Sequence, residues 1–201
     1  MFNLRPAVSR VTEPLGRSLL RAGVTPNAVT VAGTVVSVVG AVLLLGTGRL
    51  ALGATVVTLA VLTDALDGTM ARMSGGSTRW GAFLDSSLDR FADGAVLASL
   101  AFWFATGGDD DVLCAVALVG LVLGSITSYV KARAQSLDMT CDVGIVERTE
   151  RLVLALFGAF LTGLGLDLAL PVGLWVLAVL SAVTVGQRLA EVRRQAVLLS
   201  S

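Results

Sequence analysis

The chain has 201 residues, with 15 basic and 15 acidic side chains, no histidine and 55% apolar residues. A mean hydropathy of +0.83 is too high for a soluble domain of ordinary composition, so we expect an integral membrane protein. The lack of histidine excludes Ser-His-Asp triads, Cys-His pairs and zinc sites with histidine ligands. We also expect no nucleic-acid partner.

Residues 1–22 mix four arginines with apolar side chains. This mixture is typical of an amphipathic helix at the cytoplasmic interface, where basic residues meet anionic lipid, and it also suits a basic flank of a first span. Thr25 and Pro26 then predict a helix start, with threonine as the N-cap and proline in the first turn. The run from residue 22 to residue 48 has no charge and is long enough to cross a bilayer.

Five further uncharged runs follow, at residues 50–63, 94–108, 112–130, 152–166 and 168–187. Each of them needs, or continues into, charged residues at one end, so the predicted helices extend into those segments. With the N-terminus in the cytoplasm, every Lys and Arg except Arg49 lies on the inner side or in the inner part of a span, as the positive-inside rule favours. We therefore expect one all-α domain in the cell membrane, with an amphipathic interfacial helix over residues 1–22 and a bundle of six transmembrane helices over residues 23–201.

Four aspartates stand in two pairs near the inner ends of the second and third predicted spans. Asp64 and Asp67 are three residues apart, and Asp85 and Asp89 are four apart, so each pair shares one face of a helix. A glycine-rich turn at residues 73–77 separates the pairs, so two antiparallel helices can bring them face to face. Four such carboxylates would repel one another unless something positive lies among them. An all-oxygen site of this kind suits Mg²⁺, Mn²⁺ or Ca²⁺.

These aspartates also carry a family resemblance. The pattern Asp64-x2-Asp67-Gly68-x2-Ala71-Arg72-x8-Gly81-x3-Asp85-x3-Asp89 resembles the complete signature of the CDP-alcohol phosphotransferases, which move a phosphatidyl or similar group from a CDP-linked donor to an alcohol and release CMP. The resemblance implies that all four aspartates bind Mg²⁺ or Mn²⁺, that Asp89 is also the general base, and that the protein is a homodimer. It further implies that one set of residues binds CDP-diacylglycerol: Asn27, Ala28, Val29, Thr30, Gly68, Arg72 and Thr78.

Basic residues at the inner ends of the last three predicted spans bear on the acceptor alcohol. As a group they favour an anionic acceptor, because arginine binds phosphate with two donors, although each one also suits a topological flank. Segments 128–134 and 147–151 resemble the actinobacterial phosphatidylinositol phosphate synthases, and this implies that Lys131, Arg151 and Arg188 hold the phosphate of an inositol phosphate. Arg133 and Arg148 are weaker candidates. Glycerol 3-phosphate, the acceptor of phosphatidylglycerol phosphate synthases, stays open as an alternative.

Other interpretations of the aspartates also stay open. In a purely structural one, they pair with Arg72, Arg79 and Arg90 and hold helices together. A cation transporter would need its charges near the bilayer midplane and broken helices in repeated halves. A membrane subunit without activity would leave the clustered aspartates without a purpose. Asp93 lies one turn beyond Asp89, outside the signature, and is predicted to form salt bridges or to support the site from behind.

Overall fold

The computed structural model describes the backbone of residues 5–199 and the side chains of residues 12–198. All regular structure in that part of the chain is helical: α1 (Arg5–Arg21), α2 (Pro26–Gly40), the π-helix η1 (Ala41–Leu45), α3 (Leu50–Val61), α4 (Thr63–Met73), α5 (Arg79–Thr106), α6 (Asp111–Gln135), α7 (Arg148–Gly163) and α8 (Ala169–Leu199). Residues 1–4 of the predicted interfacial helix lie outside the described residues.

Four helical segments of the described chain are long and apolar enough to cross a membrane. They are Pro26–Leu45, Leu50–Met73, Asp111–Gln135 and Ala169–Leu198. The other two predicted spans, α5 and α7, do not meet that standard, because α5 carries several charged residues in its first half and α7 has only 16 residues. The protein is therefore an all-helical membrane protein.

The first span begins as the sequence predicts and ends less regularly. Thr25 is the N-cap of α2, with its side-chain oxygen 3.2 Å from the backbone nitrogen of Ala28, and Pro26 is the first helical residue. The sequence predicts an uninterrupted helix, but the last five residues form the π-helix η1. There α3 comes very close, because a Cβ atom on Gly53 would lie 2.9 Å from the backbone nitrogen of Leu45.

The second and third predicted helices meet the expected pattern closely. α3 and α4 follow each other with a break at Leu62, so together they carry the chain from residue 50 to residue 73. Residues 74–78 then reverse the chain, and Gly75 and Gly76 adopt φ values of 98° and 109° that favour glycine. Thr78 starts α5 by accepting a hydrogen bond from the backbone nitrogen of Gly81 at 3.0 Å. α5 therefore runs back antiparallel to α4 and α3, packed against α2, η1 and α6.

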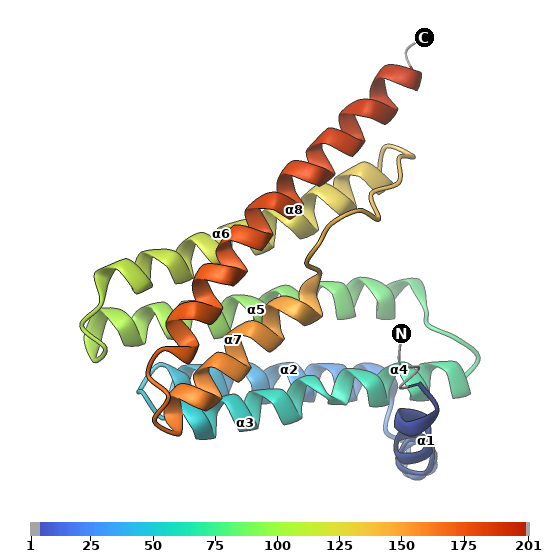
Figure 1. Ribbon diagram of the computed structural model, residues 1–201. Helices are drawn as coiled ribbons and strands as arrows, with labels where there is room; N and C mark the ends of the chain where they lie inside the picture. The colour runs from blue at the N-terminus through green and yellow to red at the C-terminus, as the bar shows by residue number, and fades with distance from the viewer. Residues whose placement is uncertain (1–4, 200–201) are drawn as a thin grey trace.

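The long helices lie side by side, while α1 lies crosswise at one end, beside α4 (Figure 1). α2 packs against α3, α4 and α5, α6 packs between α5 and α8, and α7 packs against α3 and α8. The hydroxyl oxygens of Thr12 and Thr69, 3.1 Å apart, join α1 to α4. This arrangement puts the start of α4, the middle of α5, the last third of α6 and the start of α7 close together.

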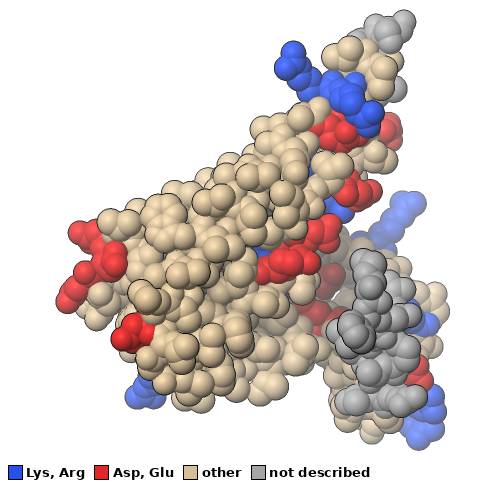
Figure 2. Space-filling model, in the orientation of Figure 1, with Lys and Arg blue, Asp and Glu red and all other residues tan. Residues whose placement is uncertain are grey.

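Apolar side chains lie both inside and outside the bundle. A core of buried residues, including Val57, Leu100 and Leu174, joins η1 to α3, α5, α6, α7 and α8. Large apolar side chains are also exposed, among them Phe102 at 60% and Leu168 at 76%. Figure 2 shows a broad face over the helices without charged side chains, which gather toward its ends. An apolar exterior of this extent is what a lipid-facing surface requires.

Candidate active site

The four predicted metal ligands, which we call the acid cluster, are Asp64 and Asp67 on α4 and Asp85 and Asp89 on α5. One nitrogen atom shows that the two helices turn these residues toward each other. The Arg148 Nη1 atom lies 3.0 Å from Asp64 Oδ2 and 2.7 Å from Asp89 Oδ1. A single guanidinium group from α7 thus joins the acids of α4 to those of α5, as the helix pairing predicts.

Asp67 is the most deeply placed acid of the cluster, with 7% of its surface exposed. It accepts a hydrogen bond from the Thr30 hydroxyl at 2.6 Å, which connects α2 to α4. Among the described residues neither Asp67 nor Asp85 forms an ion pair with a lysine or arginine. A buried carboxylate held by neutral donors alone still lacks a positive partner.

The chemistry of the acid cluster fits a divalent cation. Carboxylate oxygens are the donors that Mg²⁺ and Mn²⁺ prefer, and the charges of Arg148 and Arg90 leave the four acids with a negative surplus. Within residues 12–198, however, no three acidic, histidine or cysteine side chains converge closely enough to surround an ion. Arg148 lies among the acids that would do so. The residues that would hold the metal are therefore present, with an arginine among them.

The predicted donor-binding residues fall into two groups. Asn27 and Thr78 lie together where α2 and α5 begin, because a Cβ on Gly81 would lie 3.1 Å from Asn27 Oδ1 and 3.2 Å from Thr78 Oγ1. Beside them Ala28 is exposed and Val29 is half-buried. Only a residue without a side chain fits at position 81 without moving its neighbours.

The second group lies on α4. A Cβ on Gly68 would meet only the Arg72 Nη1 atom, at 3.7 Å, so the helix backbone is open there. Arg72 is exposed and donates from Nη2 to Thr69 Oγ1 at 2.9 Å. Thr30 stands apart from both groups, because its hydroxyl is already bound to Asp67.

A cavity of about 740 Å³, which we call the basic cavity, brings the predicted acceptor residues to the predicted base. Lys131 of α6, Arg151 of α7 and Arg188 of α8 all line it, together with Asp89 of α5. These residues come from four helices and are up to 99 positions apart, from Asp89 to Arg188. The basic cavity therefore has one residue of the acid cluster, Asp89, and the three predicted basic side chains among its lining residues.

The three predicted acceptor residues have different surroundings. Lys131 Nζ lies 2.7 Å from Asp142 Oδ1, and this contact lowers the pKa of the exposed Asp142 carboxyl. The Arg188 side chain is buried and donates to two backbone oxygens, of Val143 at 2.9 Å and Thr127 at 2.7 Å. Arg151 is also buried. Its nearest carboxylate oxygen, on Asp93, is 3.8 Å from Nη2, beyond hydrogen-bond distance.

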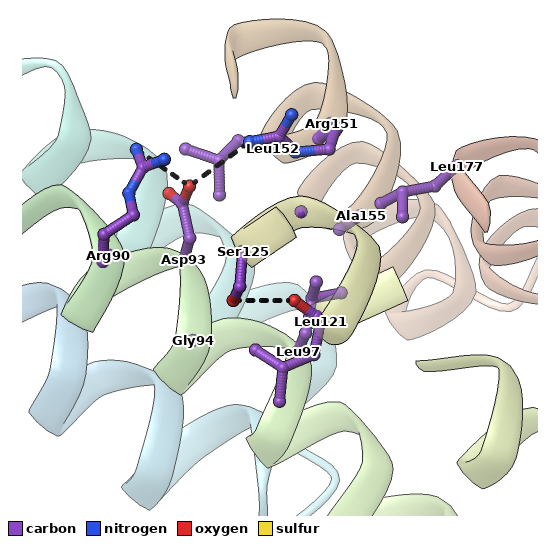
Figure 3. Close-up of a pocket in the computed structure, with 11 residues that line it drawn as sticks. Arg90, Asp93, Gly94, Leu97, Leu121, Ser125, Arg151, Leu152, Ala155 and Leu177 are labelled. Atoms are coloured by element: carbon purple, nitrogen blue, oxygen red, sulfur yellow. Dashed lines mark hydrogen bonds and ion pairs between the residues drawn. The ribbon is translucent and has the colours of Figure 1, made fainter. Parts of the chain in front are cut away.

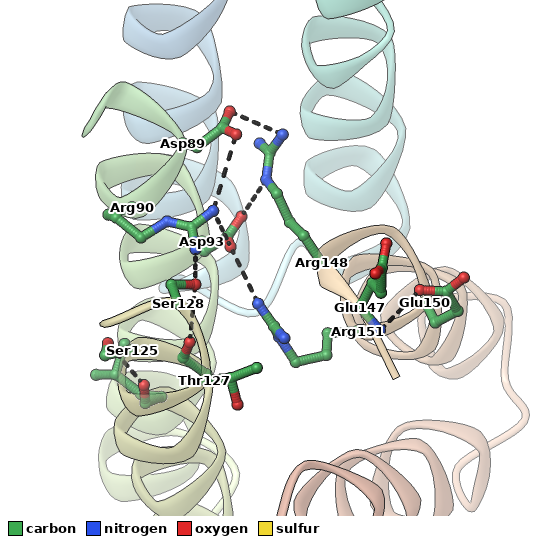
Figure 4. A network of polar contacts seen from close by, with 12 residues as sticks. Asp89, Arg90, Asp93, Ser125, Thr127, Ser128, Glu147, Arg148, Glu150 and Arg151 are labelled. Carbon is green, nitrogen blue, oxygen red and sulfur yellow. Dashed lines mark hydrogen bonds and ion pairs between the residues drawn. The ribbon is translucent and has the colours of Figure 1, made fainter. Parts of the chain in front are cut away.

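Two further arginines of the basic cavity, Arg148 and Arg90, have a larger part in the site than the sequence predicts. Arg148 has a central place among the acids, whereas Arg133 donates to Ser136 and does not line the cavity. Arg90 pairs with Asp89 at 3.8 Å and donates to the Ser128 hydroxyl (Figure 4). Its place directly after Asp89 is the signal that would have found it.

The predicted structural pairing with Arg72, Arg79 and Arg90 is only partly correct. Of these three arginines, Arg90 alone forms an ion pair with the described aspartates of this region. The cation that joins α4 to α5 is Arg148, from a helix 84 positions later in the chain than Asp64. The prediction that Asp93 forms salt bridges is confirmed, since it pairs with arginines of α5 and α7.

Comparison with known proteins gives a consistent picture. The family model described as CDP-alcohol phosphatidyltransferase matches residues 23–186. A phosphatidylinositol phosphate synthase of Mycobacterium marinum is 49% identical over 194 residues, which cover 95% of this chain and 83% of that protein. One of Streptomyces avermitilis is 46% identical over 198 residues, covering 95% of this chain and 81% of the relative.

Two solved structures of Mycobacterium tuberculosis phosphatidylinositol phosphate synthase are also similar. Both are 46% identical in sequence and superpose with a TM-score of 0.88. The one with CDP-DAG bound covers 91% of this chain and 94% of its own. The one in complex with manganese and citrate covers 90% of this chain and 88% of its own.

Proposed function

The chain belongs to the CDP-alcohol phosphatidyltransferase family, and from this premise we infer that it transfers the phosphatidyl group of CDP-diacylglycerol to a myo-inositol phosphate. The products are phosphatidylinositol phosphate and CMP. The observation that carries this proposal is the basic cavity, where Lys131, Arg151 and Arg188 face the same space as Asp89. A phosphorylated alcohol held by those cations would have its hydroxyl group next to the base.

The roles of the acid cluster follow from the reaction. A hydroxyl oxygen of the acceptor forms a bond to the phosphorus of the phosphatidyl group, and the bond from that phosphorus to the oxygen of CMP breaks. We assign Asp89 as the base that takes the hydroxyl proton, since its carboxylate lines the basic cavity. Asp64, Asp67 and Asp85 would hold Mg²⁺ or Mn²⁺ together with Asp89. When bound, the metal supplies positive charge for the diphosphate.

The two groups of donor-binding residues fit the head of CDP-diacylglycerol. Asn27, Ala28, Val29 and Thr78 would contact the nucleotide, and Thr30 would hold Asp67 in place. Gly68 would let the diphosphate approach the backbone of α4, and Arg72 would pair with a phosphate oxygen. The openness of α4 at Gly68 supports this assignment.

The lipid part of the donor fits a second cavity, of about 750 Å³, between α3 and α7. Its walls are mostly apolar, with Leu59, Leu156 and Phe160 among them, and it reaches Asp64 and Arg148 at its polar end. An acyl chain lying there would keep its hydrocarbon in the bilayer while the diphosphate reached the acid cluster.

We propose six membrane spans, with α5 and α7 as the third and fifth. Both lie within the bundle against helices that are long and apolar enough to cross a membrane, which supports the proposal. The crosswise α1 would lie at the membrane interface, and the whole chain would form one domain with the N-terminus and the site on the cytoplasmic side of the cell membrane (Figure 1). Labelling of single cysteines introduced at Arg49 and at Ser77 in intact cells tests this, since only the cysteine at Arg49 should react from outside.

The family resemblance also supports a homodimer, which light scattering of the purified protein in detergent would test. The central experiment measures CMP release by purified protein supplied with CDP-diacylglycerol and Mg²⁺. We expect turnover with a myo-inositol monophosphate and little with glycerol 3-phosphate or free inositol. The opposite preference between the two phosphorylated alcohols would replace the acceptor while keeping the family.

A further inference from the structure

Three arginines converge on one carboxylate, Asp93, in the floor of the site (Figure 4). Arg148 Nε lies 3.0 Å from Asp93 Oδ1, and Asp93 Oδ2 lies 3.5 Å from Arg90 Nη2 and 3.8 Å from Arg151 Nη2. Asp93 itself is 17% exposed at its side chain. It stands one helical turn beyond Asp89 and is not part of the acid cluster.

We propose that Asp93 is a positioning residue that sets the arginines of the basic cavity for an anionic acceptor. This inference rests on the proposed function, because the anion it serves is the phosphate of the acceptor. Asp93 would not touch the substrate. It would act by fixing the guanidinium groups that do.

The contacts of Arg148 show how Asp93 directs a neighbouring group. The guanidinium gives its Nε atom to Asp93 and points its Nη1 atom toward Asp64 and Asp89. Because a guanidinium is planar and its donors have a fixed geometry, holding one edge determines where the other edge points. Without Asp93 the Arg148 side chain would lose the anchor nearest to its own backbone.

Of the three arginines around Asp93, Arg151 is the one whose N–H groups are most available to bind a phosphate. Its 3.8 Å contact with Asp93 is an ion pair without a hydrogen bond, and no other ion pair of Arg151 is found in the described part of the chain. The charge of Asp93 therefore attracts this buried guanidinium group, and its N–H groups donate no hydrogen bond to Asp93. A phosphate in the basic cavity would accept two of them in the geometry that arginine and phosphate prefer.

Little space for water remains beside Asp93 and its arginines, which makes the charge of Asp93 important. A small cavity of about 20 Å³ lies there, lined by Arg90, Asp93 and Arg151 and by the apolar side chains of Leu97, Leu121 and Leu177 (Figure 3). Arg90 Nε is buried there without a hydrogen-bond partner among the described residues. With little water to screen them, Arg90 and Arg151 would repel each other more strongly if Asp93 were neutral, because Asp93 is the carboxylate that contacts both.

The test is the variant Asp93→Asn, which keeps the shape of the side chain and removes its charge. We expect the KM for a myo-inositol monophosphate to rise tenfold or more, with kcat changing less than KM and the KM for CDP-diacylglycerol within twofold of wild type. Asp111→Asn, at the opposite end of the bundle, is the matched control and should match wild type. If Asp93 merely dilutes the positive charge of the cavity, the KM for the acceptor would fall instead, and that result would overturn the proposal.

Two further measurements keep the proposal testable on its own. Asp93→Glu keeps the charge and moves it by one methylene, so a KM for the acceptor equal to that of wild type would also contradict a positioning role. Titration calorimetry with inorganic phosphate, without CDP-diacylglycerol, measures anion binding apart from turnover. If wild type failed to use any inositol phosphate, the proposed acceptor would be wrong. Weaker phosphate binding by Asp93→Asn would still support the positioning role of Asp93. Phosphate binding equal to that of wild type would contradict that role.

Discussion

The position of Arg148 among the acids leads to two predictions for Arg148→Gln, a lower stability of the metal-free protein and a higher affinity for metal. Arg148→Gln removes the only described cation that contacts both Asp64 and Asp89. In the protein without metal, the acids would then keep, of the described ion pairs, only the 3.8 Å contact of Arg90 with Asp89, so the variant should be less stable. With metal present, Arg148 would no longer compete for the same carboxylates, so the variant should bind the metal more tightly.

The size of the effect follows from two contacts. Arg148 Nη1 lies 2.7 Å and 3.0 Å from its two carboxylates, and its side chain is 23% exposed. A hydrogen bond to a charged group contributes about 1.5–3 kcal/mol, and partial exposure favours the lower value for the pair together. A difference of about 1.5 kcal/mol corresponds to a roughly tenfold change in a dissociation constant.

The assay is a titration of the purified protein in detergent with Mn²⁺, following the free ion by electron paramagnetic resonance. Arg148→Gln should bind Mn²⁺ about tenfold more tightly than wild type, and its unfolding temperature without metal should be lower. Arg133→Gln is the matched control, because Arg133 bonds to Ser136 and lies outside the basic cavity. An affinity for Mn²⁺ that is unchanged or weaker in Arg148→Gln would refute the reasoning.

Three other predictions concern single residues. Lys131→Ala should raise the KM for the acceptor without changing the unfolding temperature. Arg188→Ala should raise that KM and also lower the unfolding temperature, because two backbone oxygens lose a buried donor at about 1–3 kcal/mol each. Equal unfolding temperatures of the two variants would contradict this. Gly163→Ala should lower the free energy of unfolding by about 1–3 kcal/mol, because its methyl would lie 2.8 Å from a Cα atom of α3. Gly186→Ala, inside α8 with nothing within 4 Å, should instead raise it by about 0.5–1 kcal/mol. Asp89→Asn should reduce kcat by roughly 10²–10⁴-fold with normal folding, and ordinary turnover would exclude Asp89 as the base.

The features predicted from the sequence are those set by local spacing. The start of α2 at Thr25 and Pro26, the turn at residues 74–78 and the shared face of Asp85 and Asp89 each depend on neighbours within a few positions. Local backbone geometry sets these features whatever the helix packs against in the folded protein. The antiparallel directions of α4 and α5 followed from the short turn between them, although α2 packs against both.

The features that escaped prediction depend on packing between distant helices. Nothing in the segment 147–151 says that Arg148 reaches Asp64, because that contact depends on how α7 packs against α3. In the same way Lys131 and Arg188 have the same flanking character in the sequence, yet one side chain is partly exposed and the other is buried. The π-helix η1 coincides with a tight contact to Gly53, which the sequence of residues 41–45 alone does not contain.

An experimental structure of the protein soaked with Mn²⁺ and CDP-diacylglycerol would test the metal site directly. We expect anomalous density for manganese between α4 and α5, with oxygens of Asp64, Asp67, Asp85 and Asp89 as ligands and the diphosphate beside it. Arg148 should have moved away from Asp64 and Asp89. Carboxylates that still bind only Arg148 under saturating Mn²⁺, or density for manganese elsewhere, would contradict these expectations.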